Sequence, residues 1–162
     1  MEAPTHLWRR LAVLGVAALI APVAAGTASS ATLPNPCTLL SKVHAETTLA
    51  KGKAVVVTHG KLANHGSGSL ASSTCSEMIG TLPVYLTVSH SFGGFGGIKV
   101  TSITHPSGLG PGDELVVGAS PTGSPVDFIV FHKSTVYVDL SANGANPSRL
   151  TTLARQVYKL LP

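Results

Sequence analysis

The residues of this chain that could carry chemistry are two cysteines, seven histidines and a large number of serines. Cys37 and Cys75 lie far apart in the sequence, whereas redox-active pairs usually have the close Cys-x-x-Cys spacing. Only one intramolecular pairing is available to two cysteines. In an oxidising compartment the pattern therefore predicts one structural disulfide, which would stabilise the fold by about 4 kcal/mol in the chain-entropy model.

The histidines are spread along the chain without the spacing of a metal site. Imidazole binds zinc and copper well, and three convergent histidines could form a centre. No His-x-x-x-His falls on an expected helix, however, and no His-x-His on an expected strand. His44-Ala45-Glu46 is similar to the His-x-Glu of zinc deaminases but lacks their downstream Pro-Cys-x-x-Cys. We expect scattered histidines and no metal or other cofactor; the six that follow the first 31 residues are His44, His59, His65, His90, His105 and His132.

The serines do not occupy a recognisable catalytic setting. A hydrolase elbow, Gly-x-Ser-x-Gly between a strand and a helix, is absent, and so is a Ser-x-x-Lys box. No catalytic residue is therefore assigned. A triad can still assemble from distant positions, with Asp113, Asp127 or Asp139 as its acid. A secreted hydrolase with a dispersed Ser/His/Asp or metal site remains the alternative to a non-enzymatic protein.

Two glycine-rich segments and one acidic pair also need an interpretation. Phosphate-binding loops connect a strand to the start of a helix and usually contain a lysine. Neither residues 66–68 nor residues 93–97 have this setting. We interpret both as turns. Phe92 and Phe95 either fold back onto the core, which we favour, or contact a partner. Asp113-Glu114 could hold a cation, although solvated acids at a strand entrance are the favoured interpretation.

The first 31 residues have the pattern of a secretory signal peptide. Arg9 and Arg10 precede an uncharged run over residues 11–25, and small residues continue to Ala31. Gly15 and Pro22 interrupt the run, which is short of the roughly 20 apolar residues of a spanning helix. We favour cleavage after Ala31, with cleavage after residue 25 or an uncleaved anchor as alternatives. No cysteine at the exit offers lipid attachment, so the prediction is a secreted protein, extracellular or cell-wall associated.

Composition restricts the partners of the remaining chain. Residues 32–162 suffice for one domain that buries about two thirds of its unfolded surface. The whole chain has 11 Lys plus Arg against 7 Asp plus Glu, a formal net charge of +4. The basic residues are scattered, so we expect a solvated surface and no specific nucleic-acid binding, with weak polyanion association as a third hypothesis. We also expect no stable membrane anchor after leader cleavage and an unidentified envelope or extracellular ligand.

Hydrophobic periodicity predicts an α+β fold for residues 32–162. We expect an N-terminal helix over residues 42–50 capped by Ser41, and a C-terminal helix from Pro147 to Leu161 capped by Asn146. Residues 60–73 are interpreted as a mobile surface loop. Consecutive strands imply a mainly antiparallel sheet with both helices on one face, the last two strands forming a hairpin. The expected strands are residues 54–58, 81–91, 98–104, 114–118, 126–132 and 135–140.

Three short motifs resemble an actinobacterial family of secreted proteins and lipoproteins known as domain of unknown function 3558. They are Pro36-Cys37-Thr38-Leu39-Leu40-Ser41 before a short helix, the second cysteine at Cys75, and Gly108-Leu109-Gly110 with Asp113-Glu114 before a strand. The similarity extends over most of residues 36–161. The resemblance implies a disulfide-linked α+β domain in the cell envelope or medium and supplies no family catalytic residues. The leading hypothesis is accordingly a secreted, non-enzymatic module that binds a ligand or partner.

Overall fold

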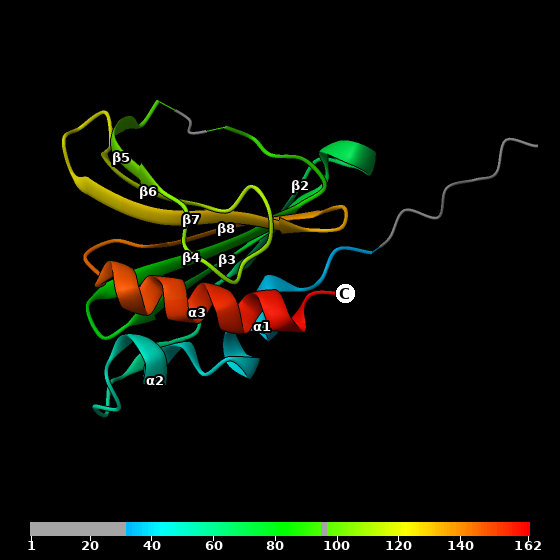
Figure 1. Ribbon diagram of the computed structural model, residues 1–162. Helices are drawn as coiled ribbons and strands as arrows, with labels where there is room; N and C mark the ends of the chain where they lie inside the picture. Colours follow the sequence, from blue (N-terminus) through cyan, green and yellow to red (C-terminus); the bar gives the residue numbers. More distant parts are fainter. Residues whose placement is uncertain (1–31, 95–96) are drawn as a thin grey trace, which may run out of the picture.

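The computed structural model describes residues 32–94 and 97–162, and within these ranges the strands form one eight-stranded sheet (Figure 1). The strand order is β1-β3-β4-β8-β7-β6-β5, and β2 also pairs with β3. Every described pairing is antiparallel, which confirms the predicted α+β class. The predicted signal peptide, residues 1–31, lies outside the described residues. The strands are β1 Val57–Thr58, β2 Leu62–His65, β3 Ser72–Ile79, β4 Leu82–Ser89, β5 Lys99–Thr104, β6 Glu114–Ala119, β7 Pro125–Lys133 and β8 Val136–Ala142.

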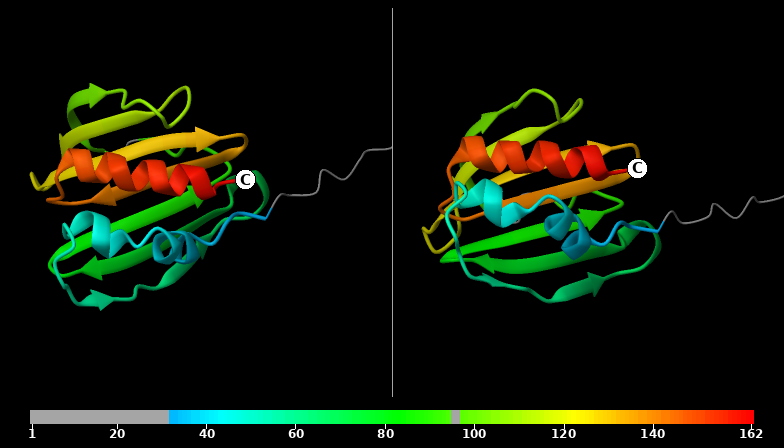
Figure 2. Two further views of the ribbon diagram at one scale, coloured as in Figure 1. Left: turned by 60° about the horizontal axis from the view of Figure 1, so that its bottom comes forward. Right: turned by 90° about the horizontal axis from the view of Figure 1, so that it is seen from below.

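The α-helices of the described residues cover one face of this sheet (Figure 2); they are α1 Pro36–Lys42, α2 Ala45–Leu49 and α3 Pro147–Leu160. Alternate residues of each strand point to this face. The main core forms where they meet the helices, and it includes Leu86, Phe131, Leu140 and Leu153, all fully buried. No helix of the described residues is long and apolar enough to cross a membrane.

The C-terminal helix and the last hairpin agree with the sequence pattern. Asn146 caps α3, its Oδ1 accepting the backbone N–H of Ser148 at 2.9 Å, and Pro147 takes the first turn. The β7–β8 hairpin turns at Ser134, whose φ of 54° is left-handed. The Lys133 ammonium donates to the carbonyl of Leu161, which ties the chain end to this hairpin.

The predicted N-terminal helix over residues 42–50 is wrong in its start and its continuity. The first helix begins at Pro36, and its cap is Asn35, whose Oδ1 accepts the backbone N–H groups of Cys37 and Thr38 at 2.9 and 3.1 Å. It ends by His44, where a left-handed φ of 48° separates α1 from α2. Asn-Pro is a stronger helix start than Ser41, because the amide caps and proline sets φ for the first turn.

The stretch between the helices and β4 also differs from the prediction. The strand expected over residues 54–58 shortens to β1, and the expected loop over residues 60–73 contains β2 and a short 3-10 helix, Gly68–Leu70. The whole of β3 was missed, because serine and threonine dominate it and hide its alternation. Gly60 shows how closely this edge packs, since a Cβ there would lie 0.8 Å from the carbonyl oxygen of Ser76.

The predicted disulfide between Cys37 and Cys75 is confirmed. Its two Cα atoms are 5.1 Å apart, and it joins α1 to the middle of β3. Cys75 is fully buried on the helix-covered face of the sheet. The bridge therefore holds the N-terminal helix against the same core that α3 covers.

Candidate functional site

The opposite face of the sheet carries no α-helix of the described residues (Figure 2), and polar side chains occupy its centre. Thr87 of β4 is the register partner of Asp139 of β8, and Asp139 is the partner of Val130 of β7. Val130 in turn pairs with Glu114 of β6. Because partners on one face of a sheet lie side by side, these four side chains form a row across four strands. We call this surface the helix-free face.

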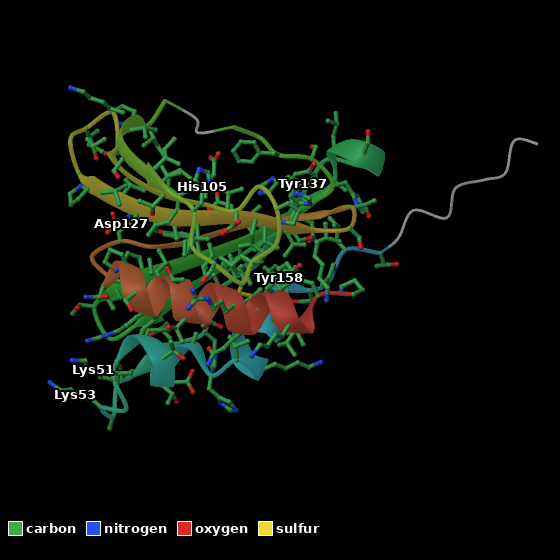
Figure 3. All side chains as sticks on the ribbon, in the orientation of Figure 1. Lys51, Lys53, His105, Asp127, Tyr137 and Tyr158 are labelled. Atoms are coloured by element: carbon green, nitrogen blue, oxygen red, sulfur yellow. A yellow bond between two sulfur atoms is a disulfide. The ribbon has the colours of Figure 1, made fainter. Side chains whose placement is uncertain are left out.

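Tyr137 marks the position of the helix-free face relative to the helices. In Figure 3 its side chain lies on one side of the sheet, and Tyr158 of α3 lies on the other. The Tyr158 ring packs edge-on against Phe131 of the main core, with 6.1 Å between ring centroids. The two tyrosines thus belong to separate environments, one within the helix packing and one beside the polar row.

A cavity of about 250 Å³ opens on the helix-free face. Its floor is formed by Thr87 and Ser89 of β4, Tyr137 and Asp139 of β8, and Val130 of β7. Its cover comes from two connections, which contribute Leu70 from the 3-10 helix and Phe92, Gly93 and Gly94 from the segment after β4. We call it the Asp139 cavity.

Asp139 is the only acidic residue among the described residues that line this cavity. Burial raises the pKa of its carboxyl from the ordinary 3.8 to about 6, because the charged form loses solvation. Among the described residues, no hydrogen bond or neighbouring charge offsets this effect. The carboxyl therefore changes its protonation state close to neutral pH, which ordinary aspartates do not.

Hydroxyl groups beside Asp139 are held by short hydrogen bonds. The Thr87 hydroxyl lies 2.9 Å from that of Thr74 on the neighbouring strand β3. The Ser89 hydroxyl donates to the carbonyl oxygen of Ser91 at 2.7 Å, so the segment after β4 is tied to the cavity wall. These contacts fix two hydroxyl groups in the lining that contains Asp139, and hydroxyl oxygens can accept hydrogen bonds from a ligand.

A second cavity of about 120 Å³ continues along the same face toward β6. It shares Phe92, Val130 and Tyr137 with the Asp139 cavity and adds Glu114 and His132. The rings of His132 and Tyr137 lie 5.3 Å apart between centroids. Among the described residues the buried Nδ1 of His132 has no hydrogen-bond partner, which leaves a polar atom unsatisfied at this end of the face.

The other histidines lie outside this site. The Nδ1 of His44 lies 3.5 Å from the Oε1 of Glu46, and the Nδ1 of His59 lies 3.8 Å from the Oε1 of Glu77. Burial raises the pKa of the Glu77 carboxyl. The ring Nδ1 of His105 lies 2.7 Å from the carbonyl oxygen of Asp113. His65 is exposed on β2 and His90 lines a different cavity. Within residues 32–94 and 97–162, no three metal-binding side chains converge and no serine hydroxyl is hydrogen-bonded to a histidine.

The three aspartates considered as triad acids are not equivalent in the structure. Asp139 lies in the cavity, whereas Asp127 lies toward the opposite end of the hairpin from Tyr137 (Figure 3). Asp113 precedes β6 and is only 7% exposed, with a buried Oδ2 that lacks a partner among the described residues. The interpretation of this pair as solvated acids is therefore wrong for Asp113, because the turn before β6 folds inward against the sheet, whereas Glu114 is half-buried.

Phe92 folds back toward the sheet, and its contact with a partner stays a prediction. Its side chain lines both cavities and is still 43% exposed, so it forms part of the rim. Phe95 lies outside the described residues. The signal for Asp139 itself was present in the pattern, since a charged residue alternates there with buried Val138 and Leu140 on a strand. What the sequence concealed was its neighbour Thr87, which comes from a strand distant in sequence.

Basic side chains gather at a different place. A shallow depression of about 520 Å³ near α2 is lined in part by Lys51, Lys53 and Arg149. The two lysines are exposed and point away from the body of the protein (Figure 3), whereas Arg149 donates to the carbonyl oxygen of Leu49 at 2.7 Å. The two lysines are therefore solvated, whereas Arg149 is held against the end of α2.

No family model, no curated protein and no solved structure matches this chain in the comparisons with known proteins.

Proposed function

We propose that this protein is an exported, non-enzymatic module that binds a small ligand in the Asp139 cavity. One observation carries the proposal: a recessed carboxyl and two hydrogen-bonded hydroxyls share a cavity with aromatic and aliphatic side chains. Concave sites that combine apolar and aromatic walls with placed polar groups are the usual location of a bound ligand. Residues with strongly raised pKa values also concentrate at such sites.

Export is part of this proposal. It is supported by the arginine pair, the uncharged run and the small-residue exit within residues 1–31. The Cys37–Cys75 bridge agrees with folding in an oxidising compartment. The proposal also includes membership of the family called domain of unknown function 3558, supported by the Pro36-Cys37 helix start, the position of Cys75 and the Gly108-Leu109-Gly110 turn.

Binding is favoured over hydrolysis by the surroundings of the candidate nucleophiles. Acyl transfer needs a serine within hydrogen-bond reach of a base. The described part of the chain places Ser89 against the carbonyl of Ser91 and places the ring of His132 against Tyr137. Neither group is paired as a nucleophile and its base, whereas both line a surface that can contact a ligand.

A ligand screen on the oxidised protein tests the proposal. Thermal unfolding is measured with metals, anionic lipids, neutral sugars and small amines, because a ligand that binds the folded state raises Tm. Ser89→Phe fills the Asp139 cavity and should abolish the rise given by any stabilising class. Ser102→Phe adds the same ring at exposed β5 and serves as the matched control. Absence of stabilisation by every class, or an equal rise in folded Ser89→Phe, contradicts the proposal.

A further inference from the structure

We infer that the ligand of the Asp139 cavity carries an alkylammonium group, whose nitrogen binds the carboxylate of Asp139. The inference rests on the proposed function, since it names the chemical class bound at the same cavity. It follows from the charge, the shape and the donor and acceptor groups of the helix-free face.

The charge of the two cavities is opposite to that of the chain. The sequence has 11 Lys plus Arg against 7 Asp plus Glu, yet the described lining of both cavities contains Asp139 and Glu114 and no lysine or arginine. A carboxylate withdrawn from water is stabilised when an opposite charge lies within about 4 to 6 Å. The protein supplies no such charge at Asp139 among its described residues, so a ligand cation can supply it.

The shape and chemistry of the cavity suit an ammonium group on a short chain. An ammonium has three N–H donors, and the Asp139 carboxylate with the Thr87 and Ser89 hydroxyls offers acceptors for them. Phe92 and Tyr137 add aromatic rings at the wall, which attract a cation when it lies over a ring face. A volume of about 250 Å³ is below the usual range for drug-sized ligands. The cavity therefore fits an amine head and a few methylenes.

Other ligand classes fit the same residues less well. An anion would meet two carboxyl groups without a lysine or arginine in the described lining. A metal ion would find one carboxylate and neutral hydroxyls, and the described residues contain no cluster of three metal ligands. A neutral sugar could hydrogen-bond to the hydroxyls but would leave the desolvated Asp139 charge uncompensated.

The titration of Asp139 gives this binding a characteristic pH dependence. An ammonium binds the ionised carboxyl, so affinity should fall about tenfold per pH unit below the Asp139 pKa of about 6. The other titratable groups facing it are Tyr137 on β8, His132 on β7 and Glu114 on β6. Tyr85 of β4 lies on the same face, two residues from Thr87, but lines neither cavity, and the described cover contributes no titratable group. Protonated His132 would also repel a cation, so His132→Gln is measured in parallel to separate the two effects.

The same ammonium chemistry occurs in free diamines and in lysine side chains of peptides. Calorimetric titrations at pH 7.5 therefore use 1,5-diaminopentane and a lysine amide blocked at its α-amino group, with glucose and inorganic phosphate as neutral and anionic probes. We expect one or both amines to bind and the other two probes to be silent. The tighter amine identifies the source of the ligand.

Asp139→Asn is the decisive variant, because it keeps the shape of the side chain and removes its charge. We expect at least a tenfold loss of amine affinity, whereas Asp127→Asn, on the same hairpin outside the cavity, should bind as the wild type does. Circular dichroism confirms folding of each variant. Equal amine binding by Asp139→Asn overturns the inference. If glucose binds, Ser89→Phe abolishes that binding and neither amine binds, the ammonium assignment is overturned but the cavity remains a binding site. If no probe binds in either the calorimetric or the thermal assay, both the ammonium assignment and the proposed binding function are overturned.

Discussion

The two faces of the sheet are built from the same strands but have different contents. On the helix-covered face, β4, β7 and β8 contribute Leu86, Phe131 and Leu140, all fully buried under α1 and α3. The residues next to Leu86 and Leu140, Thr87 of β4 and Asp139 of β8, lie on the helix-free face. Because side chains alternate along a strand, one stretch of chain can supply a stability face and a binding face independently.

The cover of each face explains the difference. Helices present long apolar side chains that fill the space above the main core. The helix-free face is covered by connections rich in glycine and serine, which leave the Asp139 cavity and its smaller neighbour open. Its only described apolar cluster is small, centred on Val116, Phe128 and Val130. Substitutions on the two faces should therefore have separable effects.

The largest effect is expected from truncating the helix-covered face. Leu140→Ala should lower the free energy of unfolding by about 2 to 5 kcal/mol, because it removes buried methyl groups and leaves a cavity. Ser141→Ala, the next residue on the opposite face, should change it by less than about 0.5 kcal/mol. Urea denaturation of both variants measures the contrast. Equal losses would remove the distinction between the faces.

Loss of the disulfide should be almost as costly. Closing the loop between Cys37 and Cys75, which are 38 positions apart, contributes about 4 kcal/mol in the chain-entropy model. The double variant Cys37→Ser with Cys75→Ser should therefore unfold at a lower urea concentration than the oxidised wild type. Adding reductant should destabilise the wild type and leave the double variant unchanged. A wild type that resists reduction-dependent destabilisation would contradict this role.

Asp139→Asn should change the free energy of unfolding by a smaller amount that depends on pH, and should raise it rather than lower it. Burial raises the folded pKa from 3.8 to about 6, so the folded state disfavours the charged carboxyl. Wild-type stability relative to the variant is then greatest below pH 4 and falls as pH rises through 6. Above pH 7 the asparagine variant should be more stable by up to about 3 kcal/mol. Urea denaturation midpoints of the wild type and Asp139→Asn at pH 4 and pH 8 measure this change in relative stability. A stability difference that is the same at both pH values would contradict the shifted pKa.

The smallest expected effect concerns the hydroxyl pair beside the cavity. Thr74→Val removes one partner of the 2.9 Å contact with Thr87 and should cost about 1 kcal/mol. Thr74→Ser keeps the hydroxyl and controls for its loss. Thermal unfolding of the two variants separates them. If Thr74→Ser and Thr74→Val shift Tm equally, the hydroxyl contact is not what stabilises this part of the helix-free face.

The sequence revealed the elements whose local signals agree with their packing. Alternation identified β4 and the β7–β8 hairpin, and Asn146-Pro147 marked the start of α3. It did not reveal β3, because Ser and Thr on one face hide the buried Cys75 and Ile79 on the other. The prediction of α1 failed because Asn35-Pro36 outcompetes Ser41 as a helix start.

The candidate site was less predictable than the fold. Asp139 stood out only as one of three acids that a dispersed triad could use. The cavity around Asp139 is formed together with Thr87, Val130 and Phe92, which lie on other segments of the chain. The order of strands that are distant in sequence cannot be derived from alternation alone. Burial of Asp113 was unpredictable for the same reason, since the inward fold of the preceding turn is a tertiary effect.

The most direct test of the binding face is a carbon-13 NMR titration of the Asp139 side-chain carboxyl, with and without 1,5-diaminopentane. Comparison with Asp139→Asn assigns the signal. The structure predicts a pKa of about 6 for the free protein and a clearly lower pKa when the amine is bound, because the ammonium stabilises the carboxylate. An Asp139 pKa that saturating amine leaves unchanged would contradict the central claim that this carboxyl binds a cationic ligand.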